Sequence, residues 1–251
     1  MCEMFGVSSG RTIAVTTELK EFFKHGEYNP HGWGIASWND AGKITIDKEP
    51  VDSTKSTKLN AILSAGLSCR GIIAHIRRAT IGHADHKNTH PFIAHDQNWR
   101  EWVFAHNGTI FESDELLPYK DIQSGSTDSE RILLYILDKN KGIRDEAERF
   151  KIMDLVAVKL SDKNKLNFLA YDGQDLYIHK NESGTMYRKN IDGAVFFATR
   201  PLDEGVWEEI PLNQLLVYRD GKLVYEGKAH DHTYIYDEQQ MNMLLMEYSQ
   251  L

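Results

Sequence analysis

The second residue of the chain is a cysteine, and its position points to one specific kind of catalysis. An initiator methionine followed by a small residue is normally removed, so we expect the mature chain to begin at Cys2. That residue would then carry a thiol, with an ordinary pKa of about 8.5, and an α-amino group, with an ordinary pKa of about 7.7–8.0. The amine can accept the thiol proton near neutral pH, so one residue supplies a nucleophile and its base. Residues 3–7 form a strand-like run, which would keep this terminus ordered where most termini fray.

A nucleophile that attacks an amide also needs hydrogen-bond donors for the oxyanion. Asn107 and Gly108 follow a strand-like run over residues 102–104 and offer a side-chain amide and a backbone N–H at one strand end. In acyl-transfer sites each such donor is worth roughly 3–4 kcal/mol. The same dipeptide is also typical of a tight hairpin turn, so by itself it does not decide between the two interpretations.

Two charged residues could bind the ends of an amino acid. Arg77 ends a strand-like run, and a guanidinium there can bind a carboxylate through two parallel hydrogen bonds. Asp128 lies in the first turn of a predicted helix and could hold an ammonium group. Each has an ordinary interpretation as well, because Arg77 could be a surface residue like Arg78, and acidic residues are favoured at helix N-termini by the helix dipole.

The elements that must position these residues are mostly short strands. Branched and aromatic runs predict strands over residues 4–8, 33–38, 43–47, 72–77, 102–106, 154–160, 165–171, 175–179, 194–199, 214–218 and 222–225. Apolar spacing predicts helices over residues 16–25, 55–67, 129–140 and 238–248, and the polar stretch 81–100 predicts a long loop. Thr127 and Glu130 have the spacing of a capping box at the start of the third helix. Many antiparallel strands with few helices indicate an α+β fold in which two sheets pack face to face with helices outside.

Length and charge exclude several classes of protein. The chain has 251 residues, for which we expect a single domain over residues 1–251. Its 29 basic and 37 acidic residues give a net charge of −8, without the basic stripe typical of nucleic-acid binding. No apolar run approaches the roughly 18 residues of a membrane span, and no signal-peptide pattern opens the chain. With only two cysteines, we expect a cytoplasmic protein. The negative net charge and the lack of a long apolar run predict that it has no nucleic-acid or membrane partner.

Several short motifs, taken together and in this order, resemble one known family. They are the Met-Cys start, His-Gly-Trp-Gly-Ile-Ala over residues 31–36, residues 74–82, Asn-Thr-His-Pro-Phe over residues 88–92, residues 106–108 and Ser-Thr-Asp-Ser-Glu over residues 126–130. The set is similar to the glutaminase domain of class II glutamine amidotransferases, which are N-terminal-nucleophile (Ntn) hydrolases. The resemblance covers roughly residues 2–137 by motif, and the Cys-Glu start is similar to the short, stand-alone branch.

The resemblance implies a four-layer αββα sandwich and a role for each candidate residue. Cys2 would attack the γ-carboxamide of glutamine with its own α-amine as base, and Asn107 with Gly108 would hold the oxyanion. Arg77 would bind the α-carboxylate and Asp128 the α-ammonium, while Thr80 would lie in the loop that closes over the substrate. A γ-glutamyl thioester would then be hydrolysed to glutamate, without a metal or other cofactor. Many relatives carry an aromatic residue and a histidine where this chain has Arg78 and Ile81.

Several alternatives stay open at this point. The substrate could be another γ-glutamyl compound, or the chain could be a non-catalytic glutamine-binding regulatory subunit. The released ammonia could pass to a separate synthetase or transferase subunit, and the chain could form homo-oligomers. Two chemical rivals are a metal site at His86 and His90, which have i, i+4 spacing, and a conventional Cys-His pair made by Cys69 and His75.

Overall fold

The computed structural model describes residues 2–79 and 83–249, and within them two antiparallel sheets stack face to face. The first sheet has the strand order β11-β9-β10-β1-β4-β2-β3 and the second has the order β13-β12-β8-β7-β6-β5. The first sheet comprises β1 (Glu3–Ala14), β2 (Trp33–Trp38), β3 (Ile44–Glu49), β4 (Ser68–Ile76), β9 (Tyr187–Ile191), β10 (Ala194–Ala198) and β11 (Glu208–Glu209). The second comprises β5 (Phe92–His95), β6 (Glu101–His106), β7 (Phe168–Tyr171), β8 (Leu176–His179), β12 (Leu216–Arg219) and β13 (Lys222–Glu226).

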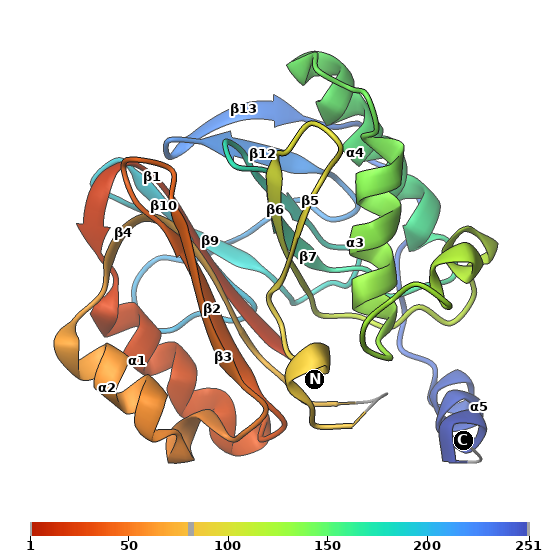
Figure 1. Cartoon of the computed structure of the whole chain (residues 1–251), viewed down its shortest axis with the longest axis horizontal. Helices are drawn as coiled ribbons and strands as arrows, with labels where there is room; N and C mark the ends of the chain where they lie inside the picture. The colour runs from red at the N-terminus through yellow and green to blue at the C-terminus, as the bar shows by residue number, and fades with distance from the viewer. Residues whose placement is uncertain (1, 80–82, 250–251) are drawn as a thin grey trace.

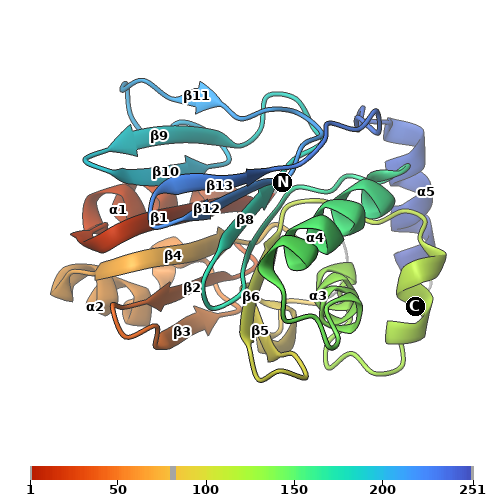
Figure 2. The ribbon, with the colours of Figure 1, turned by 90° about the horizontal axis from the view of Figure 1, so that it is seen from above.

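Helices cover the outer face of each sheet. α1 (Thr16–Lys24) and α2 (Thr57–Ala65) pack on the first sheet, and α3 (Asp128–Lys139) and α4 (Glu146–Ser161) pack on the second (Figure 1). Figure 2 shows the two helix pairs on opposite sides of the stacked sheets, with α5 (Glu238–Ser249) lying apart from both pairs. The expected αββα sandwich is therefore confirmed. No helix in the described ranges combines the length and apolar character that crossing a bilayer requires.

Alternation along the strands produces three apolar layers. Successive side chains of a strand point to opposite faces, so Met4 faces the second sheet while Phe5 faces α1. The same alternation places Val103 of β6 between the sheets and Phe104 under α3 and α4. Each large apolar side chain that is fully buried in this way stabilises the fold by about 1.5–3 kcal/mol. These layers make the sandwich a rigid frame for residues at the strand ends.

One predicted strand is wrong. Residues 154–160 belong to α4, not to a strand. Their branched residues suggest a strand when the run is read alone, but Phe150, Met153 and Leu160 repeat at helical spacing and are buried on one face. The side chain of Asp145 caps this helix by accepting a hydrogen bond from the N–H of Glu148 (2.8 Å).

Three strands were not predicted, and one of them is the two-residue β11. β5 lies inside the stretch predicted as a loop, and β9 carries mostly polar residues that are only half-buried. Edge and near-edge strands lack the apolar alternation of central strands, so little in their sequence distinguishes them from loops.

The predicted cap of α3 is confirmed in part. Thr127 Oγ1 accepts a hydrogen bond from the N–H of Glu130 (3.3 Å). The Glu130 carboxylate does not complete a capping box with Thr127, because it accepts hydrogen bonds from the backbone N–H groups of Ser124 and Gly125 (both 2.7 Å). The cap still fixes the start of α3, which places Asp128 at the first helical position.

A buried ion pair ties α4 to the second sheet. Arg149 Nε donates to Asp172 Oδ2 (2.6 Å), and Tyr177 donates its hydroxyl proton to the same oxygen (2.9 Å). Both charged side chains are almost fully buried. Burial alone would lower the pKa of Arg149, but the charge of Asp172 and the Tyr177 hydroxyl raise it above its ordinary value.

We predict that Asp172→Asn lowers the free energy of unfolding by about 3–5 kcal/mol, because it leaves the buried Arg149 charge with only its longer contact to Asp175 (3.6 Å). Glu208→Gln is the matched control, since it breaks the exposed Arg188–Glu208 pair and should cost at most about 1 kcal/mol. Urea unfolding measures both values. Equal costs for the two variants would contradict the structural role of the buried pair.

Candidate active site

Cys2 lies immediately before β1, the central strand of the first sheet. This strand is hydrogen-bonded to β4 on one side and β10 on the other. The half-buried Cys2 Sγ accepts a hydrogen bond from the backbone N–H of Arg78, which follows β4 (3.3 Å). Burial raises the pKa of the thiol above its ordinary value, while that N–H and the charges of Arg77 and Lys165 act in the opposite direction.

The residue next to Cys2 is a buried carboxylate that sequence reasoning did not identify. Glu3 is 2% exposed, accepts hydrogen bonds from His25 Nδ1 (2.8 Å) and Asn29 Nδ2 (3.4 Å), and forms an ion pair with Arg200. Burial alone would raise the pKa of Glu3, but the hydrogen bonds from His25 and Arg200 lower it below its ordinary value. These contacts fix the backbone on which Cys2 is carried.

Asn107 and Gly108 do not form a hairpin turn. Such a turn of the favoured type I′ needs positive φ at both central residues, and neither residue has it. Instead, the N–H of Asn107 donates to Asn167 O (2.8 Å), and Thr109 pairs with Lys165 in both directions. A Cβ on Gly108 would lie 2.1 Å from Lys165 O, so only glycine fits this close approach.

The Asn107 side chain is buried, and its Nδ2 has no hydrogen-bond partner among the described residues. A buried N–H group without a partner costs free energy, so a group of this kind in a native fold calls for an explanation. An oxyanion formed beside it would supply the acceptor.

One pocket brings together four of the predicted site residues. Cys2, Arg77, Gly108 and Asp128 line it, together with Ala79, His90, His106, Thr109, Thr127 and Ser129. Asn107 is not among the lining residues, although its chain neighbours His106 and Gly108 are. Thr80 and Ile81 lie outside the described residues. The pocket sits where the end of β4, the start of β1, the end of β6 and the start of α3 meet.

The two charged candidates are held firmly in this pocket. The Arg77 guanidinium is buried and donates from Nη1 to His83 O (3.0 Å). Asp128 accepts hydrogen bonds from the N–H of Ile110 (2.9 Å) and from Ser129 Oγ (3.2 Å). Burial lowers the pKa of Arg77, and the charges of Cys2 and Asp128 partly offset that effect. Side chains anchored in this way can present opposite charges to a ligand at low entropic cost.

Three buried histidines lie in or beside the pocket, and the family resemblance implied no role for any of them. His75 and His90 stack with ring centroids 4.2 Å apart, and His106 Nδ1 lies 3.0 Å from Ser129 Oγ. Burial lowers the pKa of His75 to about 3 and lowers those of His90 and His106 below their ordinary values. The rings are therefore neutral near pH 7.

The two chemical rivals are not supported by this geometry. Cys69 and His75 both lie on β4, where six residues of strand separate them by roughly 20 Å, too far for proton transfer. Burial raises the pKa of Cys69 to about 12, so its thiol is inert. His86 is exposed whereas His90 is buried, and no three metal-ligating side chains come together within residues 2–79 and 83–249.

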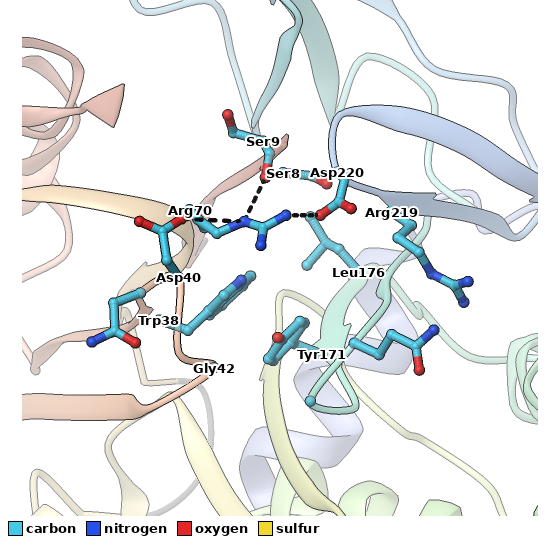
Figure 3. A pocket seen from close by; sticks show the side chains of 13 residues that line it. Ser8, Ser9, Trp38, Asp40, Gly42, Arg70, Tyr171, Leu176, Arg219 and Asp220 are labelled. Carbon is cyan, nitrogen blue, oxygen red and sulfur yellow. Dashed lines mark hydrogen bonds and ion pairs between the residues drawn. The ribbon is translucent and has the colours of Figure 1, made fainter. Parts of the chain in front are cut away.

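Figure 3 shows a second pocket, which is lined by residues from the end of β2, the start of β4 and the end of β7. Ser9 on its rim is seven residues along β1 from Cys2, roughly 20 Å away. Trp38 and Tyr171 stack in it with ring centroids 3.7 Å apart, and Arg70 pairs with Asp220. The described residues that line it include no cysteine or histidine, and its two arginines are paired with carboxylates. The described residues of this pocket therefore include no thiol like that of Cys2.

Comparison with known proteins identifies the family to which this chain belongs. The model of class-II glutamine amidotransferases matches residues 1–190, and the chain belongs to this family. The protein named "Putative glutamine amidotransferase YafJ" from Escherichia coli is 31% identical over 69% of this chain and 71% of its own length. "Gamma-glutamyl-hercynylcysteine sulfoxide hydrolase" from Mycolicibacterium smegmatis is 27% identical over 80% of this chain and 83% of its own length.

A solved structure shows the same fold. The glutamine phosphoribosylpyrophosphate amidotransferase of B. subtilis superposes with a TM-score of 0.71 at 19% identity, over 91% of this chain. The match covers 49% of that protein, so this chain spans about half its length. The likeness confirms the Ntn-hydrolase fold expected from the sequence.

We predict that Glu3→Gln makes the fold less sensitive to acid. Because the pKa of Glu3 is lowered in the folded state, its carboxylate stabilises the fold above its unfolded pKa of about 4.3, and this contribution disappears as pH falls through the lower folded value. The variant should be less stable than the wild type at pH 7 and should lose less stability between pH 5 and pH 3. Urea midpoints across this range measure both effects.

Glu21→Gln, which removes an exposed carboxylate paired with Lys24, is the control and should follow the wild-type curve. A Glu3→Gln curve parallel to the wild type would show that the buried carboxylate does not anchor the start of β1.

Proposed function

We propose that this chain hydrolyses the γ-carboxamide of glutamine to glutamate and ammonia, with Cys2 as nucleophile and its own α-amine as base after removal of Met1. The convergence of Cys2, Arg77, Gly108 and Asp128 on one pocket carries this proposal. Cys2 would supply the nucleophile and Gly108 one oxyanion donor. Arg77 and Asp128 would supply the two opposite charges that bind the α-carboxylate and α-ammonium of a free amino acid. Membership of the glutamine amidotransferase family supports the same activity.

The first half of the reaction forms a thioester. Burial keeps the Cys2 thiol protonated near neutral pH, so attack needs a base, and the tethered α-amine accepts the proton. The sulfur then attacks the carbonyl carbon of the γ-carboxamide while Asn107 Nδ2 and the N–H of Gly108 donate to the developing oxyanion. The α-ammonium of Cys2 returns its proton to the departing nitrogen. Ammonia is released, and a γ-glutamyl thioester remains on Cys2.

Water completes the cycle. The α-amine accepts one proton from the water as its oxygen attacks the thioester carbon, and the same two donors hold the second oxyanion. The C–S bond breaks, the thiolate regains its proton, and glutamate departs. Arg77 and Asp128 hold the α-carboxylate and the α-ammonium throughout, which orients the carbonyl carbon against sulfur in both halves.

A second substrate class is supported by a specific observation. One relative is named as a hydrolase of a γ-glutamyl compound, and such a compound presents the same glutamyl end as glutamine. Arg77 and Asp128 would bind both classes equally, so the leaving group alone distinguishes them. Comparison of kcat/KM for glutamine and for γ-glutamyl amides of increasing size separates the two substrates.

The fate of the ammonia belongs to the same proposal. A separate synthetase or transferase subunit would receive it, and free hydrolysis would be the outcome without that subunit. A purified protein that binds glutamine but releases no glutamate, with or without partner subunits, would instead indicate a regulatory subunit.

We predict that Cys2→Ser lowers kcat for glutamate release by more than about a thousandfold, because the hydroxyl is a far weaker nucleophile in the same position. Cys69→Ser is the matched control and should keep kcat close to the wild-type value, since Cys69 lies in the apolar layer under α1 and α2. A coupled glutamate assay measures both. Full activity in Cys2→Ser, or loss of activity in Cys69→Ser alone, would overturn the assignment of the nucleophile.

We predict that Asn107→Ala lowers kcat by about 100- to 1000-fold with little change in KM, because the oxyanion exists only in the transition state and intermediates. Asn98→Ala removes an asparagine that donates to Ile143 O elsewhere on the surface and serves as the control. Steady-state kinetics with glutamine separates kcat from KM. An effect of Asn107→Ala on KM alone would assign this residue to ground-state binding.

A further inference from the structure

His90 has a buried side chain and no role in the proposed mechanism. It is 3% exposed and lines the pocket that contains Cys2. Neither its Nδ1 nor its Nε2 has a hydrogen-bond partner among the residues that the structure describes. Buried polar groups in native proteins nearly always have a partner, so an imidazole on a pocket wall whose two nitrogens are both buried and unpartnered calls for a ligand atom as the missing partner.

The surrounding residues hold this ring rigidly. It stacks on His75 and packs edge-on against Phe92, with ring centroids 4.6 Å apart in the second contact. Lys48 Nζ donates to the carbonyl oxygens of Thr89 (2.7 Å) and Pro91 (3.2 Å), which fixes the backbone on both sides of His90. A Cβ at Gly34 would lie 2.1 Å from His90 O, so the glycine lets β2 approach this backbone closely.

The ring is also neutral, which determines what it can bind. Burial and the positive charges of Arg77 and Lys48 lower the pKa of His90 well below its ordinary value. A neutral imidazole has one N–H donor and one lone-pair acceptor. It therefore complements a small molecule that both donates and accepts hydrogen bonds, and it does not exchange a proton with that molecule near pH 7.

We propose that His90 binds and orients the water molecule that hydrolyses the γ-glutamyl thioester on Cys2, an inference that rests on the proposed function. The water donates one hydrogen bond to the imidazole nitrogen that carries the lone pair. This hydrogen bond aims an oxygen lone pair of the water at the thioester carbon. The other proton of the water passes to the α-amine of Cys2 as the new C–O bond forms. The C–S bond then breaks, the sulfur takes that proton, and the product acid ionises to glutamate.

The two halves of the reaction depend on such positioning to different degrees. During thioester formation the departing nitrogen is covalently part of the substrate, which Arg77 and Asp128 already hold. During hydrolysis the water is a free reactant, so its orientation must come from the protein. Loss of His90 should therefore slow the second half much more than the first.

The test compares His90→Phe with the wild type using glutamine as substrate. Phenylalanine keeps a ring that can stack on His75 and Phe92 but has no nitrogen. We expect kcat to fall by about 10- to 100-fold and KM to fall in parallel, so that kcat/KM, which reports thioester formation, changes little. Rapid-quench assays should show a burst of ammonia before glutamate, and intact mass should show a γ-glutamyl adduct that accumulates on Cys2.

Further variants separate positioning from a general structural effect. His90→Gln keeps an acceptor and should recover part of the hydrolysis rate, and His90→Leu replaces His90→Phe if the larger ring disturbs folding. His179→Phe alters another fully buried histidine, one that lies in β8 outside this pocket, and should lower stability without adduct accumulation.

Equal losses in kcat and kcat/KM without an adduct would overturn the role of His90, as would wild-type hydrolysis rates in His90→Phe and His90→Leu. A wild-type protein in which glutamine never acylates Cys2 would instead overturn the proposed function itself.

Discussion

The position of Cys2 depends on the buried carboxylate beside it. A chain terminus normally frays. In the proposed mechanism Cys2 is the first residue of the mature chain, so no neighbouring residue on its N-terminal side can support it. Glu3 resolves this by binding His25 from η1 (His25–Tyr28) and Arg200 from the segment after β10, so side chains far along the chain hold the first residues of β1. The strand then fixes Cys2 against the end of β4. The same contacts make this anchor sensitive to acid, because its stabilising effect requires an ionised carboxylate.

The sandwich brings the remaining groups to the same point. β1 and β4 belong to one sheet and β6 to the other, so Cys2, Arg77 and the Asn107–Gly108 segment meet only because the two sheets stack. The cap at Thr127 starts α3 so that Asp128 faces this junction. Buried histidines with lowered pKa values surround the pocket and add no positive charge near pH 7. Among the described residues that line the pocket, Arg77 is the only lysine or arginine, and we propose that a carboxylate binds there.

Much of this arrangement could be predicted from local sequence. The apolar runs of β1, β2 and β4 and the cap and apolar face of α3 were enough to predict that these elements exist. β2 and α3 also have the predicted bounds to within one residue, whereas β1 ends six residues later and β4 begins four residues earlier than predicted. Residues 154–160 were predicted as a strand because branched residues dominate a short window, whereas the helical period needs the whole of α4. The pairing of Glu3 with Arg200 joins residues 197 positions apart, and no local pattern signals it. The same holds for His90, whose importance depends on unpartnered atoms that only the packed structure reveals.

The proposed mechanism depends most on the chemical state of the first residue of the mature chain. Intact and tandem mass spectrometry of the active protein, before and after treatment with the glutamine-like electrophile diazo-oxonorleucine, measures that state directly. We expect a chain that lacks Met1, carries an unmodified α-amine and takes up one label, located on Cys2. A fully active protein that retains Met1 or is acetylated at its start, or a label on any other residue, would contradict the mechanism.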